Sequence, residues 1–174
     1  MKFSREWAMP SAETFSIAPI ERLLRWYLKD CKVIVDPFAR NSRFGTLRND
    51  LSPDTEAEHH LDAIEFCERL VSTGVRADAV LFDPPYSAHQ IVTTYQGVGE
   101  KEQNGHQARI LKDLLDRMLR DGGLALCFGW NSNGFGADRL YALDELLLVA
   151  HGGGHNDTIV TVERKMQGDL FGSG

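Results

Sequence analysis

The sequence predicts an α/β fold with a mostly parallel sheet, because short apolar runs alternate with segments of helical periodicity. Residues 79–82 form the clearest run, an apolar tetrapeptide between turn formers that is typical of a buried parallel strand. An earlier run predicts a first strand that ends at Asp36. Residues 46–48 and 58–60 predict two shorter strands.

Three segments predict helices. Pro19 occupies a suitable first helical position, and apolar residues follow it at helical spacing. Asp62 precedes a second such pattern, which it could cap. The apolar positions of the three helices are Ile20, Leu23, Leu24, Tyr27 and Leu28; Ile64, Phe66 and Leu70; and Ile110, Leu111, Leu114, Leu115 and Met118.

The last part of the chain predicts residues 124–128 as a strand and residues 145–150 and 158–163 as a closing hairpin. Residues 151–157 between the hairpin strands contain two histidines and an aspartate, which suggests a metal site. So many glycines would leave metal ligands poorly preorganised, so we predict a hairpin loop instead.

The 174 residues suffice for one domain, which we assign to residues 1–165, with a flexible tail at 166–174. No stretch approaches the roughly 18 apolar residues of a membrane span, and the first residues lack the apolar core of a signal peptide. The three cysteines lack metal-ligand spacing and indicate reduced thiols. We therefore expect a soluble, cytoplasmic protein.

The net charge of −6 is unusual for a protein that binds nucleic acid, since affinity for the backbone comes from Lys and Arg. The charge is unevenly distributed. Residues 1–48 carry nine Lys/Arg against five Asp/Glu, whereas residues 49–87 carry two against nine. A local basic face near Arg40, Arg43 and Arg48 is one interpretation, and solvated arginines are the other.

The segment Asp83-Pro84-Pro85-Tyr86 carries the strongest chemical signal, because it follows the predicted strand at residues 79–82. Groups at the carboxyl ends of parallel strands line the ligand crevice of open α/β sheets. Two prolines end the strand sharply, which allows the Pro84 carbonyl to face the crevice beside the Asp83 carboxylate. Two acceptors and an aromatic ring suit a planar base with an exocyclic amine. A Pro-Pro turn with a capping Asp is the alternative.

The surrounding motifs resemble those of the amino-methyltransferases that use S-adenosylmethionine, and are closest to small phage-type adenine-specific DNA methyltransferases. Besides the D-P-P-Y segment, the strand ending in Asp36-Pro37-Phe38 is similar to that family's first motif. Residues 14–20 are similar to its N-terminal cofactor segment, and residues 121–128 to its Asp-Gly-Gly element before a strand. The resemblance covers roughly residues 15–165 in the expected order.

This resemblance implies a Rossmann-like methyltransferase fold: a mostly parallel seven-stranded sheet with its last strand antiparallel. Few residues separate the first two strands, so the helix between them should be short or absent. The family also continues its first motif with glycine-rich residues, whereas this chain has residues 39–43, Ala-Arg-Asn-Ser-Arg. Arg40 or Arg43 could pair with the cofactor carboxylate there, or the change could weaken cofactor binding.

The resemblance further implies roles for individual residues. Catalysis would rest on Asp83, Pro84, Pro85 and Tyr86, with Tyr86 stacked on a flipped-out adenine. Trp130, after a later strand, would open onto the same crevice, or be structural. The resemblance also implies residues that bind S-adenosylmethionine. Phe15, Ser16 and Asp36 would lie at its methionine end, together with Phe38 of the Asp36-Pro37-Phe38 motif. Asp50 would bind its ribose and Asp62 its adenine amine.

The function implied is methyl transfer to the N6 amine of adenine in DNA. An RNA base methyltransferase is the nearest alternative, since small ribosomal guanine-N2 enzymes carry the same motif. N4-cytosine methylation and a non-catalytic binding module are others. The chain has little room for a target-recognition domain. Finally, Gln167, Leu170 and Phe171 resemble the peptide that binds the bacterial sliding clamp, a second possible partner besides DNA.

Overall fold

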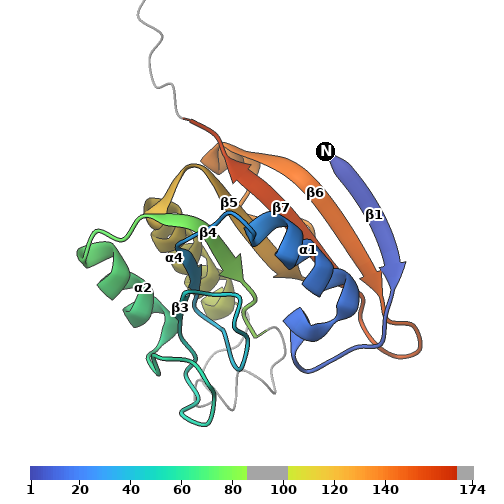
Figure 1. Ribbon diagram of the computed structural model, residues 1–174. Helices are drawn as coiled ribbons and strands as arrows, with labels where there is room; N and C mark the ends of the chain where they lie inside the picture. The colour runs from blue at the N-terminus through green and yellow to red at the C-terminus, as the bar shows by residue number, and fades with distance from the viewer. Residues whose placement is uncertain (86–101, 168–174) are drawn as a thin grey trace, which may run out of the picture.

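The computed structural model describes residues 1–85 and 102–167, which form a seven-stranded sheet between two helical layers (Figure 1). The strands lie in the order β1-β6-β7-β5-β4-β2-β3. Only β7 runs antiparallel to its neighbours, β5 and β6, and every other pair is parallel. This confirms the predicted fold. The strands are β1 (Lys2–Trp7), β2 (Ile34–Asp36), β3 (Leu47–Arg48), β4 (Ala77–Phe82), β5 (Leu119–Gly129), β6 (Tyr141–Ala150) and β7 (Thr158–Lys165).

Helix α1 (Ala18–Leu28) covers one face of the sheet, and α2 (Ala63–Ser72) and α4 (Glu102–Met118) cover the other (Figure 1). Two short 3-10 helices, η1 (Thr14–Ser16) and η2 (Ala137–Arg139), lie in connections. Pro19 stands in the first turn of α1, as predicted.

Each layer has its own apolar core, and alternate residues of the central strands point to opposite faces. Ala79 and Leu81 of β4 face α1, whereas Val80 and Phe82 face α2 and α4. Ile20, Leu24 and Leu115 are fully buried at the predicted helical positions. The central strands are therefore apolar on both faces, as expected for strands covered on both sides.

The connection from β2 to β3 contains no helix among its residues, all of which are described, and this confirms the prediction. The strand predicted at residues 58–60 reduces to a single parallel bridge between Asn49 and His59. The seventh strand is instead β1, at the outer edge of the sheet (Figure 1). Because β1 is exposed along most of its length, its sequence carries no apolar alternation, and only pairing with β6 defines it.

The predicted hairpin is formed by β6 and β7. His151 in its loop is buried, and its ring contacts the Ala8 carbonyl and the Thr158 hydroxyl, both at 2.8 Å. These partners give His151 a structural role. Within residues 1–85 and 102–167 there is no cluster of three or more His, Cys, Asp or Glu that could hold a metal ion.

In the same described part of the chain, no helix has both the length and the apolar character needed to cross a membrane. Cys67 and Cys127 are buried free thiols, and Cys31 is a half-buried one. Of the predicted tail, Met166 and Gln167 are described and exposed, and Leu170 and Phe171 lie outside the described residues.

Candidate functional site

A cavity of about 530 Å³ opens at the carboxyl ends of β2, β3 and β4. Because these strands are parallel, the segments that follow them meet at one edge of the sheet. A fourth segment, at the start of η1, also lines the cavity through Ala12 and Thr14. Asp83, Pro84 and Pro85 line it after β4, so this segment lies at the place predicted for a ligand crevice. Tyr86 lies outside the described residues.

Asn49 joins the segments that form the cavity wall. Its fully buried side chain donates to the carbonyls of Pro37 (3.2 Å) and Leu61 (3.0 Å) and accepts the Leu61 amide (3.0 Å). Its backbone binds the carbonyl of Asp36 and the amide of Ala39. One buried amide therefore holds together the residues after β2, β3 itself and the residues before α2.

Asp36, at the end of β2, is completely buried, although it does not itself line the cavity as Pro37 and Phe38 do. Its Oδ1 accepts the Phe38 amide at 3.2 Å, and its Oδ2 has no hydrogen-bond donor among the described residues. Burial raises the pKa of Asp36 to about 8, and the charges of Asp83 and Asp50 act in the same direction. A buried acceptor without a donor favours either a proton or a cationic ligand group.

Asp83 is half-buried, and its environment also disfavours its charge. Burial raises the pKa of Asp83 to about 6, while a hydrogen bond from Thr14 and the positive charge of Arg40 oppose that rise. Near neutral pH, Asp83 is therefore ionised and accepts hydrogen bonds, in a site where a second carboxyl group, Asp36, retains its proton.

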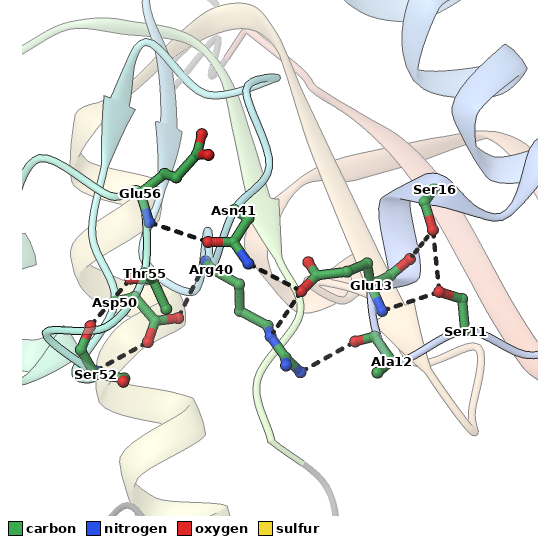
Figure 2. Close-up of polar contacts among 10 residues, drawn as sticks. All are labelled: Ser11, Ala12, Glu13, Ser16, Arg40, Asn41, Asp50, Ser52, Thr55 and Glu56. Carbon is green, nitrogen blue, oxygen red and sulfur yellow. Dashed lines mark hydrogen bonds and ion pairs between the residues drawn. The ribbon is translucent and has the colours of Figure 1, made fainter.

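Arg40 has an unusual backbone conformation in the wall of the cavity. Its φ angle is +48°, in the left-handed region that favours glycine. Its amide donates to the Asp50 carboxylate at 3.1 Å, which also accepts the Ser52 amide at 3.0 Å (Figure 2). Arg40 thus adopts a backbone conformation that favours glycine, and Asp50 is fixed beside it.

The side chains of the loop after β2 hold the N-terminal segment against the cavity (Figure 2). The Arg40 guanidinium donates to the Ala12 carbonyl at 3.0 Å and forms an ion pair with Glu13 at 3.5 Å. Asn41 donates to the same Glu13 carboxylate at 3.3 Å. Hydrogen bonds among Ser11, Glu13 and Ser16 stabilise this segment from within.

The predicted cofactor residues lie at different depths around the cavity. Phe38 and Asp50 line it. Phe15 is instead buried in the core, 4.7 Å from the Phe128 ring centroid, and the Ser16 hydroxyl donates to the Glu13 carbonyl. The predicted segment, residues 14–20, therefore reaches the cavity, but through Thr14. The roles of Phe15 and Ser16 in cofactor binding stay predictions.

Asp62 caps α2, because its Oδ1 accepts the amides of Ile64 (2.9 Å) and Glu65 (3.4 Å). It does not line the cavity, whereas its neighbours Leu61 and Ala63 do. The cap is confirmed, and the role of Asp62 at an adenine amine stays a prediction. Trp130 is about half exposed after β5 and is not among the described residues that line the cavity.

Sequence reasoning missed three contributors to this site: Thr14, Asn49 and Gly45. A Cβ on Gly45 would come within 2.7 Å of the Asp36 Cβ and 3.0 Å of the Arg48 Cγ, so this loop needs glycine for its close approach to β2. The family pattern places glycine directly after the first motif, whereas here it occurs later in the loop. The sequence did carry a signal for Gly45, because it is a lone glycine between two short predicted strands.

The basic face suggested by Arg40, Arg43 and Arg48 does not form as an isolated positive patch. Each arginine contacts a glutamate: Glu13, Glu56 and Glu58 respectively. Sequence counting could not reveal this pairing, because the partners are 10 to 27 positions away along the chain. The positive charge of this region is therefore largely neutralised locally.

The topology and the site's position define a Rossmann-like methyltransferase fold, and solved structures agree. NSun6 from Pyrococcus horikoshii, determined with SFG, aligns with a TM-score of 0.56 at 14% identity over 83% of this chain and 51% of that one. The N-methyltransferase NodS from Bradyrhizobium japonicum WM9 aligns with a TM-score of 0.52 at 14% identity over 84% and 94%. A further NodS structure holds S-adenosyl-L-homocysteine.

TrmN from Thermus thermophilus aligns with a TM-score of 0.53 at 16% identity, over 86% of this chain and 49% of that one. The chain thus spans about half the length of NSun6 and TrmN and nearly all of NodS. No protein-family model and no curated protein sequence matches it. At these identities the similarity establishes the fold.

Proposed function

We propose that this protein transfers a methyl group from S-adenosylmethionine to the N6 amine of adenine in DNA. The observation that carries the proposal is the position of Asp83-Pro84-Pro85, which lines the same cavity as the segments after β2 and β3. In this fold class the ligand crevice lies at those strand ends. The choice of adenine in DNA rests on the resemblance of the motif to adenine-specific enzymes.

The residues around the cavity fit S-adenosylmethionine chemically. This cofactor carries an ammonium and a sulfonium group, a ribose diol and one carboxylate. Asp36 offers a buried oxygen without a donor among the described residues, which suits a cationic group. Asp50 lines the cavity with its carboxylate held in place by two backbone amides, which suits the ribose hydroxyls. Phe38 supplies an apolar wall.

S-adenosylmethionine would supply an electrophilic methyl group. An adenine amine is a poor nucleophile, since its lone pair is delocalised into the ring. Asp83, which is ionised near neutral pH, would accept a hydrogen bond from this amine and favour the pyramidal form that develops in the transition state. In that transfer the bond between nitrogen and the methyl carbon would form as the bond between sulfur and that carbon breaks, the electron pair would stay on sulfur, and the amine proton would pass to solvent.

Positioning contributes the rest of the catalysis. Thr14 donates to Asp83, so the N-terminal segment orients the acceptor. Pro84 and Pro85 fix the backbone directly after it, since proline restricts φ. An in-line displacement depends on such alignment more than on a strong base.

The direct test is to incubate the protein with labelled S-adenosylmethionine and either DNA or RNA, and to identify the methylated nucleoside by mass spectrometry. Label in N6-methyladenine from DNA is the expected result. Label in an RNA nucleoside would make the protein an RNA base methyltransferase. No transfer to either, with intact cofactor binding, would favour a non-catalytic binding module.

A further inference from the structure

Arg40 is the one cation among the described residues that line the cavity, whereas Asp50 and Asp83 also line it and buried Asp36 directly precedes the lining residues Pro37 and Phe38. The carboxylates suit the cationic and hydroxyl groups of a bound nucleoside derivative. An anionic group entering this cavity has only Arg40 as a charged partner among those lining residues. The position of Arg40 therefore favours a ligand orientation that places an anionic group near the loop after β2.

Two further features of Arg40 are informative. Its left-handed backbone is strained for any residue with a Cβ, and strain of this kind persists at functional sites when the side chain is needed there. Its guanidinium already binds oxygen acceptors of the N-terminal segment, the Ala12 carbonyl and the Glu13 carboxylate. The side chain thus extends from the loop after β2 to the N-terminal segment (Figure 2).

We infer that Arg40 binds the carboxylate of the methionine moiety of S-adenosylmethionine, in exchange for its contact with Glu13. This inference rests on the proposed function. A planar guanidinium donates two parallel hydrogen bonds to a carboxylate, so it also fixes the orientation of the amino-acid end. Arg40 thus supplies a charged anchor in the loop that is glycine-rich in the resembling family, and Gly45 provides the close approach of the loop.

The exchange is feasible because the Glu13 pair is weak. The side chains of Arg40 and Glu13 are 47% and 37% exposed, and their closest charged atoms are 3.5 Å apart. Ion pairs this exposed contribute little to stability. Asn41 contacts Glu13 as well, so the glutamate keeps a partner when Arg40 turns to the ligand.

The test compares two ligands by isothermal titration calorimetry. S-adenosylhomocysteine carries the amino-acid carboxylate, and 5′-methylthioadenosine shares its nucleoside and sulfur but lacks the amino acid. Each is titrated into the wild-type protein, Arg40→Gly, Arg40→Lys and the control Arg43→Gly. Glycine tolerates the left-handed backbone at position 40, and melting temperatures verify folding. Arg43 loses the same charge three positions away, and it does not line the cavity.

Arg40→Gly should weaken the binding of S-adenosylhomocysteine about tenfold, as expected for a half-exposed charge pair. The affinity for methylthioadenosine should stay within about twofold of the wild-type value. Arg40→Lys should retain part of the affinity, and Arg43→Gly should change neither. Equal weakening of both ligands by Arg40→Gly, or no weakening, would overturn the role of Arg40 alone. Wild-type protein that binds neither ligand would overturn the proposed cofactor and this inference with it.

Discussion

Asp36 and Asp83 stand at the carboxyl ends of two adjacent parallel strands, β2 and β4, and the charge of Asp83 contributes to the raised pKa of Asp36. Burial is the larger cause, and it raises the pKa of both residues, to about 8 and about 6. The two carboxyl groups therefore differ in charge near pH 7. A cationic group would therefore have to displace the proton of Asp36, whereas ionised Asp83 can accept a hydrogen bond from an amine directly.

Asp83→Ala should abolish methyl transfer, because it removes the acceptor that stabilises the transition state. Loss of one such group costs on the order of 10² or more in rate. Affinity for S-adenosylhomocysteine should stay within a few-fold. Turnover with labelled cofactor and a titration of the same variant measure the two quantities, and wild-type turnover in the variant would contradict the mechanism.

The wild-type rate should also depend on pH, because only ionised Asp83 accepts a hydrogen bond from the amine. The rate should fall as the pH decreases through about 6. A rate that stays constant from pH 5 to pH 8 would show that catalysis does not depend on the ionisation of Asp83.

Asp36→Ala should weaken S-adenosylhomocysteine binding by about 2 kcal/mol, as expected for losing a hydrogen bond to a charged group. Calorimetry near pH 7 measures this loss. Unchanged affinity would place the amino-acid end of the cofactor elsewhere. Glu56→Gln is the matched control, because Glu56 pairs with Arg43 outside the cavity.

Asp36 should also make stability depend on pH. Its pKa is raised from an ordinary 3.8 to about 8, so between these values the folded protein holds one more proton than the unfolded chain. The free energy of unfolding should therefore fall as the pH rises, by about 1.4 kcal/mol per pH unit. Asp36→Asn should remove this pH dependence, because asparagine does not titrate.

Urea denaturation of Asp36→Asn and the wild type at pH 5 and pH 8 tests that dependence. The variant should gain stability relative to the wild type as the pH increases. The raised pKa of Asp83 acts in the same direction at lower pH, but it is present in both proteins and cancels in the difference. A difference in unfolding free energy between the two proteins that stays constant from pH 5 to pH 8 would show that Asp36 does not cause the pH dependence.

Asn49→Ala should destabilise the protein by about 3 kcal/mol, because it leaves the buried polar groups of Pro37 and Leu61 without partners. Urea denaturation measures the change. Asn41→Ala is the control, since Asn41 is more accessible and bonds exposed groups, and we expect it to cost under 1 kcal/mol. Equal losses in both variants would argue against Asn49 as the centre of the cavity wall.

A last prediction concerns recruitment to DNA. Arg40 and Arg43 after β2 and Arg48 in β3 are paired with glutamates and the net charge is −6, so we expect weak intrinsic affinity for DNA. We propose that Gln167, Leu170 and Phe171 bind a sliding clamp, which would raise the local concentration of substrate.

Truncation after Lys165, or replacement of Leu170 and Phe171 by Ala, should abolish binding to the host clamp in a pull-down. Methylation of short oligonucleotides should persist in the same variants, because the cavity is unchanged. Intact protein that fails to retain clamp at micromolar concentration would eliminate this partner.

The sequence by itself determined the sheet centre and the location of the Asp83-Pro84-Pro85 segment. Residues 79–82 form an apolar run because the strand they belong to is buried on both faces. The residues after Pro19 follow a helical repeat because one stripe of that helix is buried. Both are local signals that can be read from the sequence. The short β2–β3 connection likewise followed from counting residues. Position at strand ends then brought Asp36, Asp50 and Asp83 to one region.

Only the tertiary structure decided which side chains line the cavity and how they are charged. β1 has no apolar alternation because its side chains are exposed, so pairing with β6 alone defines it. Asn49 and Thr14 acquire their roles from partners distant in sequence, and the pairing of Arg40 with Glu13 spans 27 positions. The pKa values of Asp36 and Asp83 arise from burial, which depends on the packing of all the segments around them.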